Sequence, residues 1–191
     1  MGGERLVISD YDPAWPDQFC EIAGSLRRVL GGEALRIDHI GSTAVPGLAA
    51  KALIDVQVTL RDLVDADRWD NELLPGLVRR DEITSDHVPS GASSDPQEWA
   101  KRYWSDRGGI HVHVRAEGHL NQRYALLFRD YLRADAVAAG AYGELKRALA
   151  QAAPDDWDAY YAVKDPACDL IVTAAEHWAA RTAWVLPPAD A

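Results

Sequence analysis

The sequence has few cysteines and no long apolar run, and both shortages exclude classes of protein. Its only cysteines among 191 residues are Cys20 and Cys168, too few for the disulfide framework of a small secreted domain. No apolar run approaches the roughly 18 to 20 residues of a membrane helix, and the N-terminal residues lack the apolar core of a signal peptide. We therefore expect a cytoplasmic protein with reduced thiols and no membrane partner.

Basic residues are also scarce relative to acidic ones. The chain has 20 Lys and Arg against 30 Asp and Glu, which gives a formal net charge of −10. Sequence-independent binding to nucleic acid depends on neutralising phosphates with Lys and Arg, so we do not expect a nucleic acid partner. A free nucleotide and a small-molecule acceptor fit this charge better, and the total still allows a local basic patch. The oligomeric state is not indicated.

The length and the order of the patterns indicate one compact unit with two regions. A chain of 191 residues is long enough for one well-buried core and short for two independent domains. Strand patterns are concentrated in residues 1–118, and helical patterns take over in residues 119–191. We expect a sheet region followed by a helical region.

Turn and cap signals predict the individual elements. Asp12-Pro13 and the apolar spacing from Trp15 to Val29 predict a first helix, with Trp15 and Phe19 in the core. A second helix is predicted over 65–74, a mobile loop near the site over 85–95, and a hairpin over 99–109. Further helices are predicted from Asn121, after Gly140, over 155–164, and from Asp165-Pro166 to about Ala183, with a frayed tail over 187–191.

Two segments alternate between apolar and polar residues. In residues 54–60, Asp55 and Gln57 lie on the face opposite the apolar side chains. In residues 109–114, His111 and His113 share one face, roughly 7 Å apart by strand rise. The matched alternation predicts that these four side chains line one polar sheet face in neighbouring strands.

A turn of small residues precedes the first of these segments. Gly41, Ser42 and Thr43 offer backbone N–H groups that suit an anion, and a divalent ion can bridge a nearby carboxylate and a phosphate. Imidazoles can ligate metal, transfer protons or donate to phosphate, and His39 adds a third one. A capped turn, a structural strand acid and an inert histidine pair fit the same residues.

The chain resembles the GrpB family, whose members resemble the nucleotidyltransferase superfamily of DNA polymerase beta and kanamycin nucleotidyltransferase. The resemblance spans roughly Leu6 to Arg181. It implies an α/β (α+β) fold, with a nucleotidyltransferase-like mixed β-sheet, flanking helices and a C-terminal helical part. The matching residues are 39–51, Ile54-Asp55, 111–114, 128–133, Tyr142 with Leu145-Lys146, and, more weakly, Tyr160 with Lys164.

The superfamily resemblance also implies a site. A Gly-Ser turn holds nucleotide phosphates, two acids one residue apart on the next strand bind metal, and a third acid follows on a later strand. Asp55 matches the first acid, Gln57 occupies the position of the second, and the histidine pair lies on the strand of the third. An amide is a poorer metal ligand than a carboxylate. One metal, a metal favoured by imidazole, or nucleotide binding without transfer all remain open.

These patterns and the resemblance together define the predicted function and site. We expect binding of ATP or another nucleoside triphosphate with Mg²⁺ or Mn²⁺, and nucleotidyl transfer to, or activation of, a small acceptor. The alternative is a non-catalytic nucleotide- or metal-binding module. The predicted catalytic residues are Asp55, His111 and His113, and the predicted metal ligands are these three and Gln57. The predicted phosphate-binding residues are Gly41, Ser42, Thr43, Lys51, Arg129, Arg133, Lys146 and Lys164, with His39 and Tyr160 as further candidates.

Arginines of the helical part have a second interpretation. Arg129 and Arg133 are four residues apart and share one helix face. They can close a basic rim over a triphosphate, or they can pair with Asp130, Asp135 or other acids.

Overall fold

Within residues 5–191, six strands form one mixed sheet, and the two alternating segments lie side by side near its centre. The computed structural model describes residues 5–191, and the strand order is β1-β2-β6-β5-β4-β3. Only β2 and β6 are parallel, and their register places Asp55 opposite His111 and Gln57 opposite His113. The predicted mixed sheet is therefore confirmed. The strands are β1 (Arg36–Ile40), β2 (Ile54–Leu60), β3 (Glu72–Leu74), β4 (Leu77–Arg79), β5 (Arg102–Ser105) and β6 (Ile110–Ala116).

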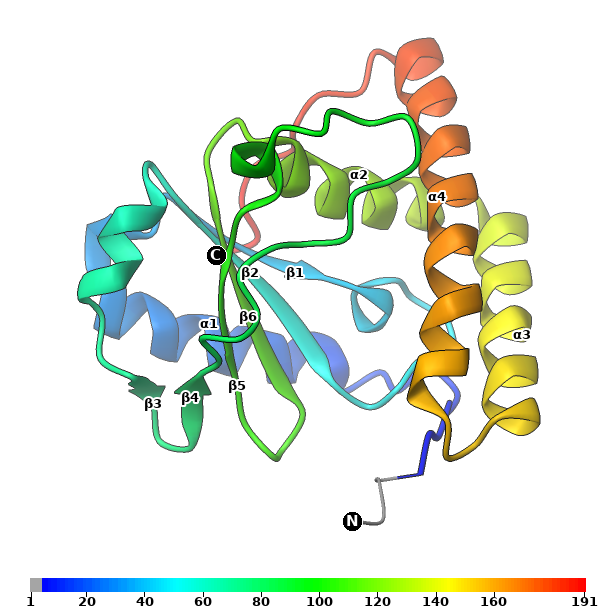
Figure 1. The fold of residues 1–191 in the computed structure, drawn as a ribbon, viewed down its shortest axis with the longest axis horizontal. Coiled ribbons are helices and arrows are strands. Elements are labelled where there is room, and N and C mark those ends of the chain that lie inside the picture. Colours follow the sequence, from blue (N-terminus) through cyan, green and yellow to red (C-terminus); the bar gives the residue numbers. More distant parts are fainter. Residues whose placement is uncertain (1–4) are drawn as a thin grey trace.

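The apolar face of the sheet packs on the first helix, α1 (Trp15–Leu30). Trp15, Phe19 and Leu26 are buried against Val56 and Val112, as their helical spacing predicts. The polar face is turned toward α2 (Leu120–Ala134), α3 (Ala136–Ala152) and α4 (Trp157–Thr182), which pack together (Figure 1). β6 ends and α2 begins on either side of the expected boundary between residues 118 and 119.

The prediction of a helix over 65–74 is wrong. A short 3₁₀ helix covers Leu63–Arg68, and β3 and β4 then form a hairpin around Pro75 and Gly76. Gly76 has φ +80°, a conformation that glycine adopts without strain at a turn. Pro-Gly ends a helix and turns a hairpin equally well, so the local signal did not separate the two structures. The predicted hairpin near residues 99–109 is confirmed by the antiparallel pair β5 and β6.

The two helices predicted on either side of Asp165 form a single helix. α4 runs through Pro166, which lies inside it, and α3 likewise begins before Gly140 rather than after it. Tyr160 and Cys168, which flank the proline, are both buried, so packing holds the helix on each side. Although α4 has 26 residues, no helix in residues 5–191 is long and apolar enough to cross a membrane.

The expectation of a frayed tail is also wrong. The backbones of Ile37 and Ala191 exchange two hydrogen bonds, of 3.2 and 3.0 Å, along the open edge of β1. The Asp190 carboxylate accepts a further bond of 2.9 Å from the backbone N–H of His39. The tail is ordered because an unpaired strand edge offers backbone donors and acceptors. Such a contact joins residues about 150 positions apart, which no local pattern reveals.

Candidate functional site

A cavity of about 440 Å³ lies between the polar face of the sheet and helices α2, α3 and α4. Most of the predicted site residues line it: Gly41, Ser42, Thr43, Lys51, Asp55, His111, His113, Lys146, Tyr160 and Lys164. Its remaining polar and aromatic lining includes Asp86, Lys101, Tyr103, Arg115, Asn121, Tyr124 and Phe128.

The Gly41–Ser42 turn is in direct contact with Asp55. Gly41 has φ +72°, and a side chain there would collide with the Asp55 carboxylate. Only glycine therefore permits this approach of backbone to carboxylate. The Thr43 hydroxyl fixes the turn by donating to the Leu53 carbonyl (3.0 Å) and accepting from His39 Nε2 (3.1 Å). The turn and the strand acid are thus held at one end of the cavity.

Two imidazoles face the same oxygen of Asp55. His113 Nε2 lies 3.3 Å and His111 Nδ1 3.7 Å from Asp55 Oδ1. Lys101 Nζ lies 3.5 Å from His113 Nδ1, and since an ammonium only donates, the His113 proton is placed on Nε2, toward Asp55. Burial raises the pKa of Asp55, but the hydrogen bond and charge of His113 together with the charges of His111 and Lys51 outweigh burial, and the net pKa is lowered. Burial lowers the pKa of His113 to about 4.

Lys146 reaches the turn from α3. Its Nζ donates to Ser42 Oγ at 2.7 Å and lies 4.4 Å from the centre of the Tyr142 ring. The residue is 2% exposed. Burial, followed by the charge of Lys164, lowers the pKa of Lys146 to about 7. This amine is therefore near its titration midpoint at neutral pH.

Lys51 approaches from the loop before β2 and contacts aromatic rings of α4. Its Nζ lies 4.7, 5.7 and 5.3 Å from the ring centres of Trp157, Tyr160 and Tyr161, and 3.2 Å from the Tyr161 hydroxyl. Lys164 Nζ lies 5.5 Å from the Tyr161 ring. Aromatic faces hold cations by their quadrupole without neutralising them. The aromatic rings of α4 therefore position both amines at the cavity.

Gln57 lies on the predicted face but has another role. It is fully buried, and its Oε1 accepts a 2.5 Å hydrogen bond from Arg115, while its Nε2 lies 3.3 Å from the Gln122 carbonyl. Gln57 is not among the lining residues. Within residues 5–191, no group of three His, Cys, Asp or Glu side chains is arranged to hold a metal ion. Among the described residues, Asp55 is thus the carboxylate that lies against the turn, and no second acid lies beside it to share a metal ion.

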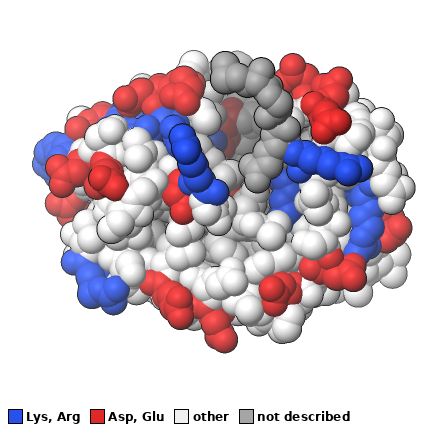
Figure 2. Space-filling view, turned by 90° about the horizontal axis from the view of Figure 1, so that it is seen from below, with Lys and Arg blue, Asp and Glu red and all other residues white. Residues whose placement is uncertain are grey.

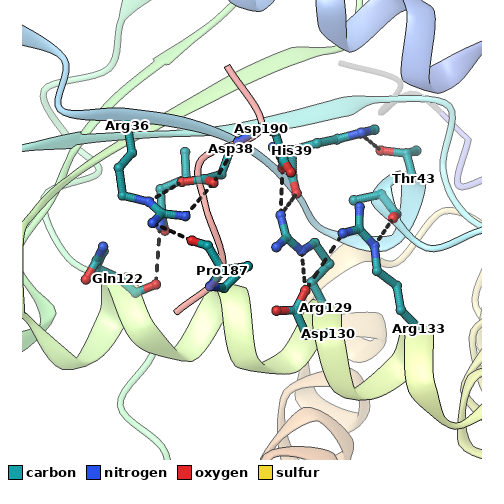
Figure 3. Close-up of polar contacts among 12 residues, drawn as sticks. Arg36, Asp38, His39, Thr43, Gln122, Arg129, Asp130, Arg133, Pro187 and Asp190 are labelled. Carbon is teal, nitrogen blue, oxygen red and sulfur yellow. Dashed lines mark hydrogen bonds and ion pairs between the residues drawn. The ribbon is translucent and has the colours of Figure 1, made fainter. Parts of the chain in front are cut away.

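Figure 3 shows Arg129 directed toward Asp130 and Asp190, and Arg133 directed toward the turn near Thr43, so the predicted phosphate role of both arginines is wrong. Arg129 is 1% exposed and donates to the His39 carbonyl (3.0 Å) and to Asp190 (2.7 Å). Arg133 donates to the Ala44 carbonyl at 2.9 Å. Neither arginine lines the cavity. The imidazole of His39 stacks on Phe19, and burial lowers its pKa to about 4.

The sequence of this chain matches the family model described as GrpB protein over residues 5–174. The chain belongs to the GrpB family. It is 32% identical to the conserved protein GrpB from Enterococcus faecalis, whose crystal structure aligns with a TM-score of 0.71 and covers 90% of this chain and 99% of that one. A UPF0157 protein of Streptomyces coelicolor is 33% identical, with 90% of this chain and 84% of that one aligned.

Longer relatives of this GrpB-family chain bear an enzyme name. A dephospho-CoA kinase of Mycolicibacterium paratuberculosis is 41% identical over 196 residues, which cover 94% of this chain and 48% of that protein. A dephospho-CoA kinase of Mycobacterium leprae is 36% identical with the same 48% aligned. The chain therefore spans about half the length of these relatives.

Sequence reasoning missed Asp86, which organises the floor of the GrpB-family cavity. Its carboxylate accepts from Lys101 (2.8 Å), from Arg115 (2.8 Å) and from Asn121 (3.0 Å). It belongs to the loop predicted over 85–95, whose Ser, Pro and Gly content indicated mobility and gave no sign that Asp86 is half-buried, with 17% of its side chain exposed. The scarcity of lysine was the signal in the sequence that could have pointed to the cavity. The chain has four lysines, and all four line it. On the face drawn in Figure 2, by contrast, Lys and Arg alternate with acids and form no broad basic patch outside the grey atoms.

Proposed function

We propose that the cavity binds a nucleoside triphosphate with one divalent cation and supports nucleotidyl transfer to, or activation of, a small acceptor. The observation that carries this proposal is the Asp55 carboxylate packed against the Gly41–Ser42 turn, inside a cavity that holds four lysines. Backbone amides and a serine hydroxyl suit phosphate oxygens, and the lysines suit the charge of a polyphosphate.

The residues fit one divalent cation and do not fit a metal pair. Asp55 supplies one carboxylate, and Mg²⁺ is commonly held by one or two carboxylates plus substrate phosphates. Gln57 cannot join it, because Arg115 already occupies its amide oxygen. Such a cation would neutralise phosphate charge and align the substrate. His111, with 30% of its side chain exposed, is the more accessible imidazole beside Asp55.

The proposed reaction assigns distinct tasks to the side chains. Ser42 and the turn amides bind phosphate oxygens, and His113 orients Asp55 through its Nε2 proton. The acceptor oxygen forms a bond to the α-phosphorus while the bond to the pyrophosphate oxygen breaks, and the acceptor proton passes to His111. Pyrophosphate leaves with its charge balanced by the lysines. Burial lowers the pKa of His111, so its imidazole is free to take a proton at neutral pH.

A binding module without transfer chemistry is the second candidate. It is favoured by Gln57, because the Arg115 contact removes the second ligand that the superfamily pattern requires. The kinase name of the longer relatives belongs to proteins about twice this length. It nevertheless makes dephospho-CoA, itself an adenine nucleotide, a reasonable acceptor or ligand to test.

Asp55→Asn tests the proposal against its matched control, Gln57→Ala. We expect the Asp55→Asn change to raise the Kd for ATP with Mg²⁺ or Mn²⁺ at least about tenfold, because it removes the anionic ligand. Gln57→Ala should leave that Kd little changed. Calorimetric titration of folded variants measures both, and labelled ATP with a panel of acceptors, including dephospho-CoA, measures pyrophosphate release.

Two outcomes separate the candidates. Equal ATP affinity in wild type and Asp55→Asn would make Asp55 a structural acid and overturn the proposal. ATP binding that depends on Asp55, with no pyrophosphate release for any acceptor, would favour the binding module.

A further inference from the structure

All four lysines of this chain line one cavity, whereas the other basic residues of the chain are arginines. Lys51, Lys101, Lys146 and Lys164 come from four different segments, and all of them line the space above Asp55. A lysine ammonium is a compact point charge with three donors, whereas arginine favours planar pairing with carboxylates. Lysines inside a cavity do not contribute to solubility as surface lysines do. Their grouping at one concave site therefore indicates a ligand with negative charge.

Two of these lysines lack a carboxylate partner. Lys101 pairs with Asp86 at 2.8 Å and Lys164 with Asp165 at 3.4 Å. Among the residues described, neither Lys51 nor Lys146 forms an ion pair with Asp or Glu, and Lys146 is 2% exposed. A buried charge without a partner costs folding free energy. A bound anion would supply the missing ion-pair partner and offset this cost.

Tyr160 contributes an unused donor at the same place. It is 1% exposed, lines the cavity, and its hydroxyl has no hydrogen-bond partner within the described part of the chain. Burial raises the pKa of Tyr160 to about 12, so the hydroxyl keeps its proton at neutral pH. An unsatisfied buried hydroxyl costs stability. Its position one helical turn before Lys164 on α4 directs both groups to one region.

We propose that Lys51, Lys146, Lys164 and Tyr160 form an anion subsite that binds the diphosphate or triphosphate tail of the ligand without a metal ion. This inference rests on the proposed function and specifies how its substrate is held. In a two-metal site, cations neutralise the phosphate tail. Here one carboxylate is present, and the lysines supply the missing positive charge. A divalent cation held by Asp55 then adds affinity for the whole nucleotide and is needed for transfer, but the phosphate tail binds without it.

Binding at this subsite should also change the protonation of Lys146. Lys146 faces Lys164, Cys168 and Tyr160 of α4, Lys51 and Ser42 of the turn region, and Tyr142 and Arg147 of its own helix. With a pKa of about 7, Lys146 is mostly neutral at pH 8 in the free protein. A bound polyphosphate favours the charged amine, so Lys146 should take up a proton when the ligand binds at pH 8.

Calorimetry with inorganic tripolyphosphate and pyrophosphate in excess EDTA tests the subsite. We expect both to bind the wild type, and Lys146→Met and Lys164→Met to weaken binding at least about tenfold, since each removes a charge-assisted hydrogen bond. Tyr160→Phe should weaken binding while leaving thermal stability equal or higher, because it removes an unsatisfied hydroxyl. Arg147→Met is the matched control, since it removes a neighbouring charge that does not line the cavity.

Proton uptake gives an independent readout. Titrations at pH 8 in two buffers of different ionisation enthalpy should show more proton uptake in wild type and Arg147→Met than in Lys146→Met, because proton exchange by the ligand itself is common to all three. Circular dichroism confirms that each variant is folded. Binding of tripolyphosphate only when Mg²⁺ is present, or equal affinity in wild type and both lysine variants, would overturn the inference.

Tripolyphosphate binding and pyrophosphate release from ATP test the subsite and the transferase activity separately. Metal-free binding of tripolyphosphate without pyrophosphate release from ATP would keep the subsite and remove the transferase. ATP turnover with no metal-free binding would keep the transferase and remove the subsite.

Discussion

At the residue scale, Arg115 decides what Gln57 and Asp86 do. Its guanidinium donates to Gln57 Oε1 at 2.5 Å and to both carboxylate oxygens of Asp86 at 2.8 and 3.0 Å. The Arg115 side chain is 6% exposed, so these contacts are shielded from water. A buried guanidinium requires fixed acceptors. Gln57 therefore completes an internal network rather than a metal shell.

The Asp86 carboxylate makes stability depend on acid pH. Burial raises its pKa, but the charge of Arg115, its hydrogen bonds and Lys101 outweigh burial and hold the pKa well below its usual range. A lowered folded-state pKa contributes stability that is present above the unfolded pKa, about 3.9, and is lost as the pH falls below it. Urea unfolding at pH 7 should show Asp86→Asn destabilised by about 3 to 5 kcal/mol.

That difference should shrink as the pH falls from 4 toward 2, because the Asp86 carboxylate then takes up a proton in the unfolded state while it stays charged in the folded state. Asp81→Asn, at a carboxylate 77% exposed, is the control and should change little. A penalty for Asp86→Asn that is constant from pH 7 to pH 2 would contradict the assigned ion pair.

At the element scale, α4 carries both the subsite and a proline. Tyr160 and Lys164 lie before Pro166, and Cys168 lies one half-turn after it, with its Sγ 3.4 Å from the Tyr142 hydroxyl. Pro166 has no N–H for the carbonyl four residues earlier, so the helix loses one hydrogen bond there. Contacts of both halves with α2 and α3 keep the helix continuous.

Pro166→Ala should stabilise the protein by about 2 kcal/mol, because the helix-interior cost of proline exceeds the entropy that proline removes from the unfolded chain. The urea midpoint measures the change. Pro16→Ala is the matched control, since Pro16 lies in the first turn of α1, where a missing N–H costs nothing. A lower midpoint for Pro166→Ala would show that the proline geometry is required by packing.

At the scale of the whole molecule, the C-terminal tail joins β1 to α2. Arg129 of α2 contacts the His39 carbonyl in β1 and the Asp190 carboxylate in the tail, while Arg36 donates to the Pro187 carbonyl at 2.7 Å (Figure 3). These contacts cover the outer edge of the sheet, which would otherwise offer unpaired backbone groups. The tail thereby completes the charge balance of a buried arginine.

Asp190→Asn should destabilise the protein by about 1 to 3 kcal/mol, because it removes one partner of Arg129 while Asp130 remains. ATP affinity should be unchanged, since neither residue lines the cavity. Urea unfolding and calorimetry measure the two effects. In a cycle with Arg129→Met, the paired variants should be non-additive, and strict additivity would contradict the contact.

The sequence by itself determined the features that repeat with a local period. The spacing of Trp15, Phe19 and Leu26 specified the buried face of α1, and alternation in β2 and β6 placed Asp55 and the histidine pair on one polar face. The family pattern selected the Gly41–Ser42 turn. These features need only neighbouring residues, because backbone geometry fixes which side chains share a face.

Tertiary structure decided which partner each of those side chains meets. Helical spacing showed that Arg129 and Arg133 share a face, but only the folded chain brings Asp190 to one and the Ala44 carbonyl to the other. Alternation placed Gln57 beside Asp55, but Arg115 occupies its oxygen. Pro166 stays helical and residues 187–191 stay ordered for the same reason. Each depends on contacts between distant segments, whose free energy outweighs the local preference.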